Sequence, residues 1–106
     1  MDDCELLELA AKAAGLRVVD TSGQGLRISS DGCCTGYPWN PLTDDGDALR
    51  LAVKLTLELD VCRSGIAVRS PRGIKTLVSA EDEPDAYIAT RRAIVRAAAE
   101  LGKVLP

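Results

Sequence analysis

The sequence contains no histidine and no phenylalanine, and its only aromatic residues are Tyr37, Trp39 and Tyr87. Histidine is the commonest general base and the commonest zinc ligand, so its absence disfavours acid–base catalysis and zinc chemistry. Three aromatic rings leave little surface for stacking on nucleic-acid bases. We therefore expect a protein that is not an enzyme and that needs no cofactor and no metal ion.

Excess positive charge is also lacking. The 106 residues carry a formal net charge of −3. Residues 1–53 hold nine acidic and four basic side chains, which gives −5, whereas residues 54–106 hold seven and nine, which gives +2. Because binding to a phosphate backbone depends on many Lys and Arg contacts, we expect no binding to duplex nucleic acid.

The chain has no apolar run near the roughly 18 consecutive residues that a membrane span needs. Its first residues, MDDCE, are acidic where a secretory signal would be basic. Both observations predict a cytoplasmic protein that does not bind a membrane, with its cysteines reduced. The cysteine spacing lacks the paired C-x2-C of a zinc site. Cys4 and Cys62 lie in apolar-patterned segments and are predicted to be small core residues, whereas the role of Cys33 and Cys34 is left open.

Hydrophobic periodicity and turn residues predict a single domain of the α+β class over residues 1–106. We expect helices at 4–14, at 44–55 and from the acidic run 81–85 to about 103, and strands at 16–20, 25–30, 57–63, 65–70 and 73–79. Strands joined by short turns must pair antiparallel. The expected order is α-β-β-α-β-β-β-α, a mostly antiparallel sheet of about five strands packed with three helices.

Residues 31–43, DGCCTGYPWNPLT, interrupt this periodicity. Their glycines, prolines and polar turn formers predict irregular structure. Thr43 is expected to cap the next helix, whose first turn holds Asp44, Asp45 and Asp47. We expect Trp39 to be buried against this helix, with a role in recognition as the alternative.

Two stretches of the chain, residues 37–55 (YPWNPLTDDGDALRLAVKL) and 89–103 (ATRRAIVRAAAELGK), resemble segments of small bacteriophage and prophage proteins of the phage ABA sandwich family. The motif WNPLT at residues 39–43 carries the resemblance most specifically, and about a third of the chain is covered. In this family helices flank a sheet in an alpha-beta sandwich. The resemblance implies a phage or prophage origin and the cytoplasm of a bacterial host, and it supplies no reaction and no catalytic residue.

These features favour a function by binding. We expect a small, non-enzymatic phage or prophage accessory protein that binds a host or phage protein, with inhibition of a host defence system, as anti-CRISPR proteins do, as its most concrete form. Loops carry recognition more often than packed elements do. The tentative partner-binding residues are Asp31, Tyr37, Trp39, Asp44, Asp45 and Asp47. A second candidate surface is the densest basic element, Arg91, Arg92 and Arg96, which could instead pair with the acidic run 81–85.

Two other functions stay open. A protein that binds nucleotides or other small ligands, as a sponge does, or a minor enzyme acting on nucleotides, would need a pocket lined by arginines and Trp39. A module that binds nucleic acid is disfavoured by the net charge.

The cluster Asp44, Asp45 and Asp47 matches no EF-hand loop, and helix capping already accounts for it. The sequence does not indicate the oligomeric state.

Overall fold

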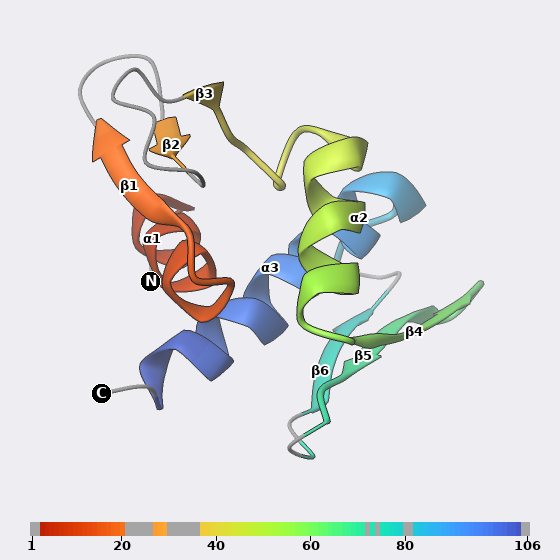
Figure 1. Cartoon of the computed structure of the whole chain (residues 1–106). Coiled ribbons are helices and arrows are strands. Elements are labelled where there is room, and N and C mark those ends of the chain that lie inside the picture. The colour runs from red at the N-terminus through yellow and green to blue at the C-terminus, as the bar shows by residue number, and fades with distance from the viewer. Residues whose placement is uncertain are drawn as a thin grey trace.

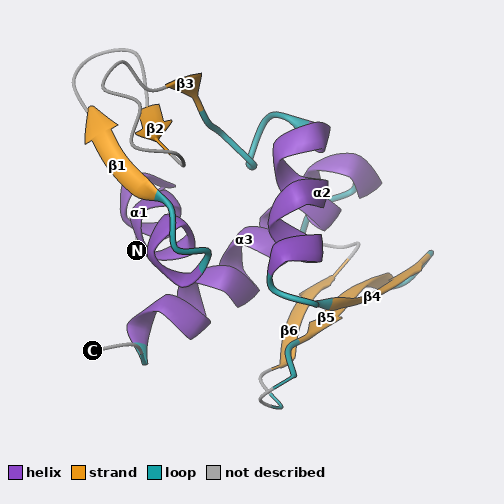
Figure 2. Ribbon diagram, in the orientation of Figure 1, coloured by secondary structure: helices purple, strands orange, loops and turns teal. Residues whose placement is uncertain are grey.

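In the computed structural model, which describes residues 3–20, 27–29, 37–71, 73, 75–79 and 82–104, three helices and six strands follow one another along the chain (Figure 1). They are α1 (Asp3–Ala13), β1 (Arg17–Asp20), β2 (Arg27–Ser29), β3 (Tyr37–Pro38), α2 (Asp45–Lys54), β4 (Glu58–Cys62), β5 (Gly65–Arg69), β6 (Lys75–Ser79) and α3 (Ala86–Lys103). Figure 2 shows the two groups of strands on opposite sides of the helices. None of the helices described has the length and apolar character needed to cross a bilayer.

The α+β class predicted from the sequence is correct, but the predicted order α-β-β-α-β-β-β-α and the single sheet of about five strands are wrong. The described strands form two separate antiparallel sheets, β1-β2-β3 and β4-β5-β6. The additional strand, β3, falls in the segment 31–43 that was expected to be irregular. It pairs Tyr37 with Ile28 and Pro38 with Arg27 of β2. Strand propensity does not reveal it because it is two residues long and contains proline, which a sheet tolerates at its edge.

The second sheet is a meander built on short turns. Arg63 and Ser64 form the turn between β4 and β5, and Cys62 stands opposite Gly65. A Cβ at Gly65 would lie 2.5 Å from the carbonyl oxygen of Val78 on β6, so the close approach of these two strands requires glycine. Short turns pair consecutive strands only, so α2, which lies between β3 and β4, divides the strands into two groups. The path of the helices then keeps the two groups apart as separate sheets.

The helix α3 joins the two halves of the molecule. It contacts α1, α2, β5 and β6 (Figure 1). The core that it helps to form is rich in alanine, and its fully buried side chains include Ala93, Ala97 and Ala98. Near its end, a Cβ at Gly102 would overlap the backbone carbonyl of Leu9 in α1. Small residues therefore set how closely α1 and α3 approach each other.

Two local predictions need correction. The cap of α2 is Asp44 rather than Thr43, since an Asp44 carboxylate oxygen accepts a hydrogen bond from the N–H of Asp47 at 2.7 Å. Cys4 and Cys62 are exposed rather than buried in the core. Cys62 belongs to the alternate set of β4 residues that points away from α3, so strand alternation explains its exposure.

Candidate functional site

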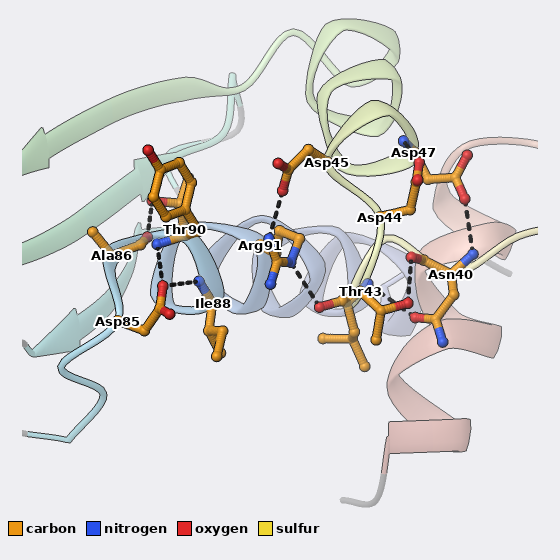
Figure 3. A network of polar contacts seen from close by, with 12 residues as sticks. Asn40, Thr43, Asp44, Asp45, Asp47, Asp85, Ala86, Ile88, Thr90 and Arg91 are labelled. Carbon is orange, nitrogen blue, oxygen red and sulfur yellow. Dashed lines mark hydrogen bonds and ion pairs between the residues drawn. The ribbon is translucent and has the colours of Figure 1, made fainter.

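The acidic residues predicted to bind a partner hold the start of α2 in place. Asp44 caps the helix, and one Asp47 oxygen accepts a hydrogen bond from the N–H of Asn40 at 2.9 Å. The other Asp47 oxygen pairs with Arg50 at 2.8 Å, and Asp47 is only 9% exposed. The Asn40 side-chain oxygen accepts a hydrogen bond from the N–H of Leu42 at 3.0 Å. Figure 3 shows Asn40, Asp44 and Asp47 gathered where the chain enters α2.

Arg91 fastens α3 to the same segment. Its Nη1 pairs with Asp45, and its Nε donates a hydrogen bond to the carbonyl oxygen of Leu42 at 2.9 Å (Figure 3). The next arginine, Arg92, pairs with Asp3 of α1 at 3.5 Å. The described partners of these arginines are thus Asp45 and Asp3, whereas the sequence suggested the acidic run 81–85.

The remaining predicted residues are spread over the molecule. Asp31 lies outside the described residues, as do Cys33 and Cys34. The backbone of Tyr37 forms β3. Trp39 is buried in the same core cluster as Leu51, so the prediction that it is buried is confirmed and its indole does not lie on the surface. The structure brings Asp45 together with Arg91, and Asp44 and Asp47 together with Arg50, whereas Arg92 and Arg96 line a different hollow.

An apolar groove of about 290 Å³ lies between α2, β4 and the start of α3. Its exposed apolar side chains are Leu49, Leu59 and Tyr87. The ion pair between Asp45 and Arg91 also borders it. Tyr87 lies two helical turns before Ile94, where the apolar periodicity of α3 would favour burial, but the structure leaves it 73% exposed.

The groove is open because α3 packs on β5 and β6, whereas β4 lies at the side of the sheet beyond α3. Leu59 and Val61 of β4 stand opposite Val68 and Ile66 of β5, so all four side chains lie on one face of the sheet. Val68 and Ile66 are buried under α3, whereas Leu59 is 39% exposed and Val61 is 57% exposed. On α2, the exposed Leu49 and Val53 lie one turn apart. We call the exposed set Leu49, Val53, Leu59, Val61 and Tyr87 the open apolar face.

One sequence signal could have indicated this face. Leu49 and Val53 are apolar residues outside the buried stripe of α2, which contains Ala48, Leu51 and Ala52. A second apolar stripe on a short helix needs a cover that is either elsewhere in the chain or in another molecule.

A second hollow, of about 560 Å³, lies between α1, α3 and β6. We call it the basic cleft, because Lys75, Arg92 and Arg96 line it, together with Leu6, Thr76, Leu77 and Glu100. Glu100 also pairs with Lys103 at 3.1 Å. Three cationic side chains line this hollow with one carboxylate, Glu100, and one of the three, Arg92, also pairs with Asp3. Such a group of cations can hold an anion.

Within the described ranges, no three cysteine, aspartate or glutamate side chains lie close enough to hold a metal ion. The open apolar face and the basic cleft are therefore the features from which a function can be inferred. Comparison with protein-family models, with curated proteins and with solved structures finds no match to this chain.

Proposed function

We propose that this protein acts by binding another protein through the open apolar face and that it catalyses no reaction. The observation that carries the proposal is the grouping of exposed Leu49, Leu59 and Tyr87 around one groove. Single apolar side chains on a surface are ordinary, whereas several around one hollow are typical of an interaction site. The charged pair at its border, Asp45 and Arg91, resembles the polar rim of a protein interface.

This surface differs from the one expected from sequence. Asp47 is held by the Asn40 N–H and by Arg50, and Trp39 is in the core, so these two residues offer little to a partner, whereas Asp44 caps α2 with its side chain still exposed. Asp45 is exposed and remains at the border of the groove. The proposed surface therefore keeps Asp45 and extends from there toward β4 and α3.

The partner implied by the sequence resemblance is a host or phage protein, with inhibition of a host defence system as the most concrete outcome. This part of the proposal rests on residues 37–55 and 89–103 and on the net charge of −3. An acidic domain can occupy a nucleic-acid-binding surface by presenting carboxylates where phosphates would lie.

The test is affinity capture from a bacterial lysate with three forms of the tagged protein: the unchanged chain, Leu49→Asp, and Val104→Asp as the matched control. Both substitutions place a carboxylate at an exposed apolar position, but Val104 lies outside the open apolar face. We expect a protein that the unchanged chain and Val104→Asp retain equally and that Leu49→Asp loses, at equal thermal stability. Equal retention by all three forms, or no specific retention by the unchanged chain, would contradict the proposal.

The basic cleft supports a second candidate function, binding of a small phosphate-bearing ligand such as a nucleotide. Its volume of about 560 Å³ lies in the range of small-molecule sites, and it is lined by Lys75, Arg92 and Arg96. The sequence analysis expected a nucleotide pocket to be lined by arginines and Trp39. Trp39 is buried in the core and is not among the residues that line the basic cleft.

Calorimetric titration with ATP, ADP and inorganic phosphate tests this candidate. We expect binding that Arg96→Ala weakens by at least tenfold and that Arg69→Ala, an exposed arginine outside the cleft, leaves unchanged. Absence of binding at millimolar ligand, or equal binding by both variants, would eliminate it.

A further inference from the structure

The strand β4 forms an edge of its sheet. The sheet order is β4-β5-β6, and no other strand in the described part of the chain pairs with the far side of β4. A two-residue turn closes an antiparallel hairpin on a hydrogen-bonded pair, here Cys62 and Gly65. Such pairs alternate along the ladder, so Leu59 and Val61 direct their N–H and C=O groups toward the free edge.

This edge lacks the protection that the other sheet edges have. β1 contains a register shift between Val18 and Asp20, and β3 is two residues long with Pro38 in it. β6 begins with Lys75 and borders the basic cleft next to α1 and α3. Bulges, prolines, lysines and covering elements are the devices that keep edge strands from pairing with other chains. β4 has five residues in continuous register with no bulge, proline or lysine, no strand in the described residues pairs with its far side, and its only charged side chains are the carboxylates of Glu58 and Asp60.

The two faces of β4 differ in chemistry. Leu59 and Val61 point to the face of the groove, and the alternate residues Glu58 and Asp60 point to the other face. Both carboxylates are exposed; Glu58 stands opposite Arg69 of β5, whereas Asp60 stands opposite an alanine, Ala67, and so has no charged residue across from it on β5. Side chains of an added strand would alternate in the same way, one set beside Leu59 and Val61 and the other set beside the carboxylates.

A second copy of this chain fits the edge poorly. Antiparallel pairing of all five β4 residues with their copies is centred on Asp60 and places two Asp60 carboxylates directly opposite each other. A register centred on Leu59 pairs only three residues of each strand and sets Glu58 opposite Asp60, and one centred on Val61 also pairs only three. Like charges opposite each other destabilise a ladder, whereas opposite charges stabilise it.

We propose that the partner adds an extended strand to the free edge of β4 and that this strand alternates apolar with Lys or Arg side chains. The inference rests on the proposed function, because it assigns the binding mode and the chemistry of the partner at the open apolar face. The backbone of Leu59 and Val61 supplies the hydrogen bonds, as in other cases of strand addition. The groove beside Leu49 and Leu59 receives the apolar side chains, and Glu58 and Asp60 pair with the basic ones.

The probe is a nine-residue peptide that alternates valine and lysine, with both ends blocked, and binding is measured by fluorescence anisotropy. The comparison peptides alternate valine with glutamate, contain the same valines and lysines in scrambled order, or carry N-methyl groups on alternate amides. We expect the alternating valine–lysine peptide to bind at least tenfold more tightly than each of the three. We also expect amide hydrogen exchange of Leu59 and Val61 to slow when it binds.

Variants of the protein separate the binding mode from electrostatic attraction. Val61→Pro removes an edge N–H while leaving the β4–β5 hydrogen bonds, and we expect it to weaken binding at least tenfold. Asp60→Lys is expected to shift the preference toward the valine–glutamate peptide. Its matched control is Asp82→Lys, an exposed carboxylate outside β4, which should change neither affinity by more than about twofold.

Equal binding of the alternating and scrambled peptides, or no effect of either Val61→Pro or N-methylation, would overturn strand addition. If Leu49→Asp still abolished capture from a lysate, the proposed function would stand with a different binding mode. If neither peptide binding nor capture depended on this face, both proposals would fail. A concentration-dependent dimer that Val61→Pro dissolves would also overturn the inference, because a second copy would then occupy the edge.

Discussion

The two ends of α3 are packed in opposite ways. Its C-terminal half meets α1 through alanines that are fully buried, and Gly102 comes against the backbone of Leu9. Its N-terminal half meets α2 through an ion pair, Asp45 with Arg91, and leaves Tyr87 exposed. Small residues at one end allow two helices to close on each other, whereas at the other end large apolar residues are exposed among the described residues. Packing at the C-terminal end of α3 therefore contributes mainly to stability. The N-terminal end of α3 borders the exposed apolar groove.

Trp39 and Tyr87 give the largest expected contrast in the free energy of unfolding. Replacing buried Trp39 with alanine should lower the free energy of unfolding by about 3–5 kcal/mol, because it leaves a cavity in the core. Replacing exposed Tyr87 in the same way should change it by less than about 0.5 kcal/mol. Urea denaturation followed by circular dichroism measures both. Similar losses in the two variants would remove the distinction between a closed and an open region.

The close contact of α1 and α3 predicts the next largest effect. Gly102→Ala introduces a methyl group where the Leu9 carbonyl already lies, so the two helices must move apart. We expect a loss of about 2–3 kcal/mol, at the upper end of the cost of overpacking. The control is Gly46→Ala in α2, whose methyl group would meet only the ends of the Asp44 and Arg50 side chains at 3.2 and 3.3 Å.

The control variant should be neutral or stabilising by up to about 1 kcal/mol, because alanine favours a helix over glycine. Denaturation curves of Gly102→Ala and Gly46→Ala at the same protein concentration test the pair. A Gly102→Ala protein as stable as the unchanged chain would show that α1 and α3 do not pack as described.

Arg91 predicts a smaller effect at the N-terminal end of α3. Arg91→Ala removes the hydrogen bond to the Leu42 carbonyl and the ion pair with Asp45, and it should cost about 1–2 kcal/mol. Arg91→Lys keeps the charge but cannot reach both acceptors with one planar group, so it should recover only part of the loss. Arg96→Ala, at an exposed position on the same helix, should cost almost nothing. Equal stability of Arg91→Ala and Arg96→Ala would contradict the role of Arg91 in joining α3 to α2.

Local physics explains what could be predicted from the sequence. The helices follow from apolar periodicity and capping acids, and the β4–β5 hairpin follows from the turn at Arg63 and Ser64 with Gly65 directly after it. The predicted cap of α2, Thr43, and the observed cap, Asp44, differ by one residue. Both residue types are good N-caps, and only the geometry of the turn decides between them. The division into two sheets could not be predicted, because it depends on where α2 and α3 carry the chain.

The candidate site depends on contacts between distant residues, so little of it could be predicted. Leu59 and Ile66 follow the same apolar alternation in sequence, yet α3 covers Ile66 and leaves Leu59 partly exposed. Tyr87 continues the apolar stripe of Ile94 in sequence, but none of the described residues buries it. Asp47 looked like a surface acid, and its hydrogen bond to the Asn40 backbone depends on how the preceding segment turns.

The smallest expected change in stability belongs to the free edge. Val61→Thr keeps the shape of the side chain and replaces a methyl group with a hydroxyl at a position that is 57% exposed, so the free energy of unfolding should change by less than about 0.5 kcal/mol. Val68→Thr makes the same replacement on the same face of the sheet under α3, where the buried hydroxyl should cost about 1–3 kcal/mol. Urea denaturation measures the two costs, and retention on a hydrophobic-interaction column measures the exposed apolar surface. We expect Val61→Thr to shorten retention although stability is unchanged, and Val68→Thr to lower stability without shortening retention of the folded protein. The opposite pattern would show that α3 covers β4 rather than β5, and the open apolar face would then have to be placed elsewhere.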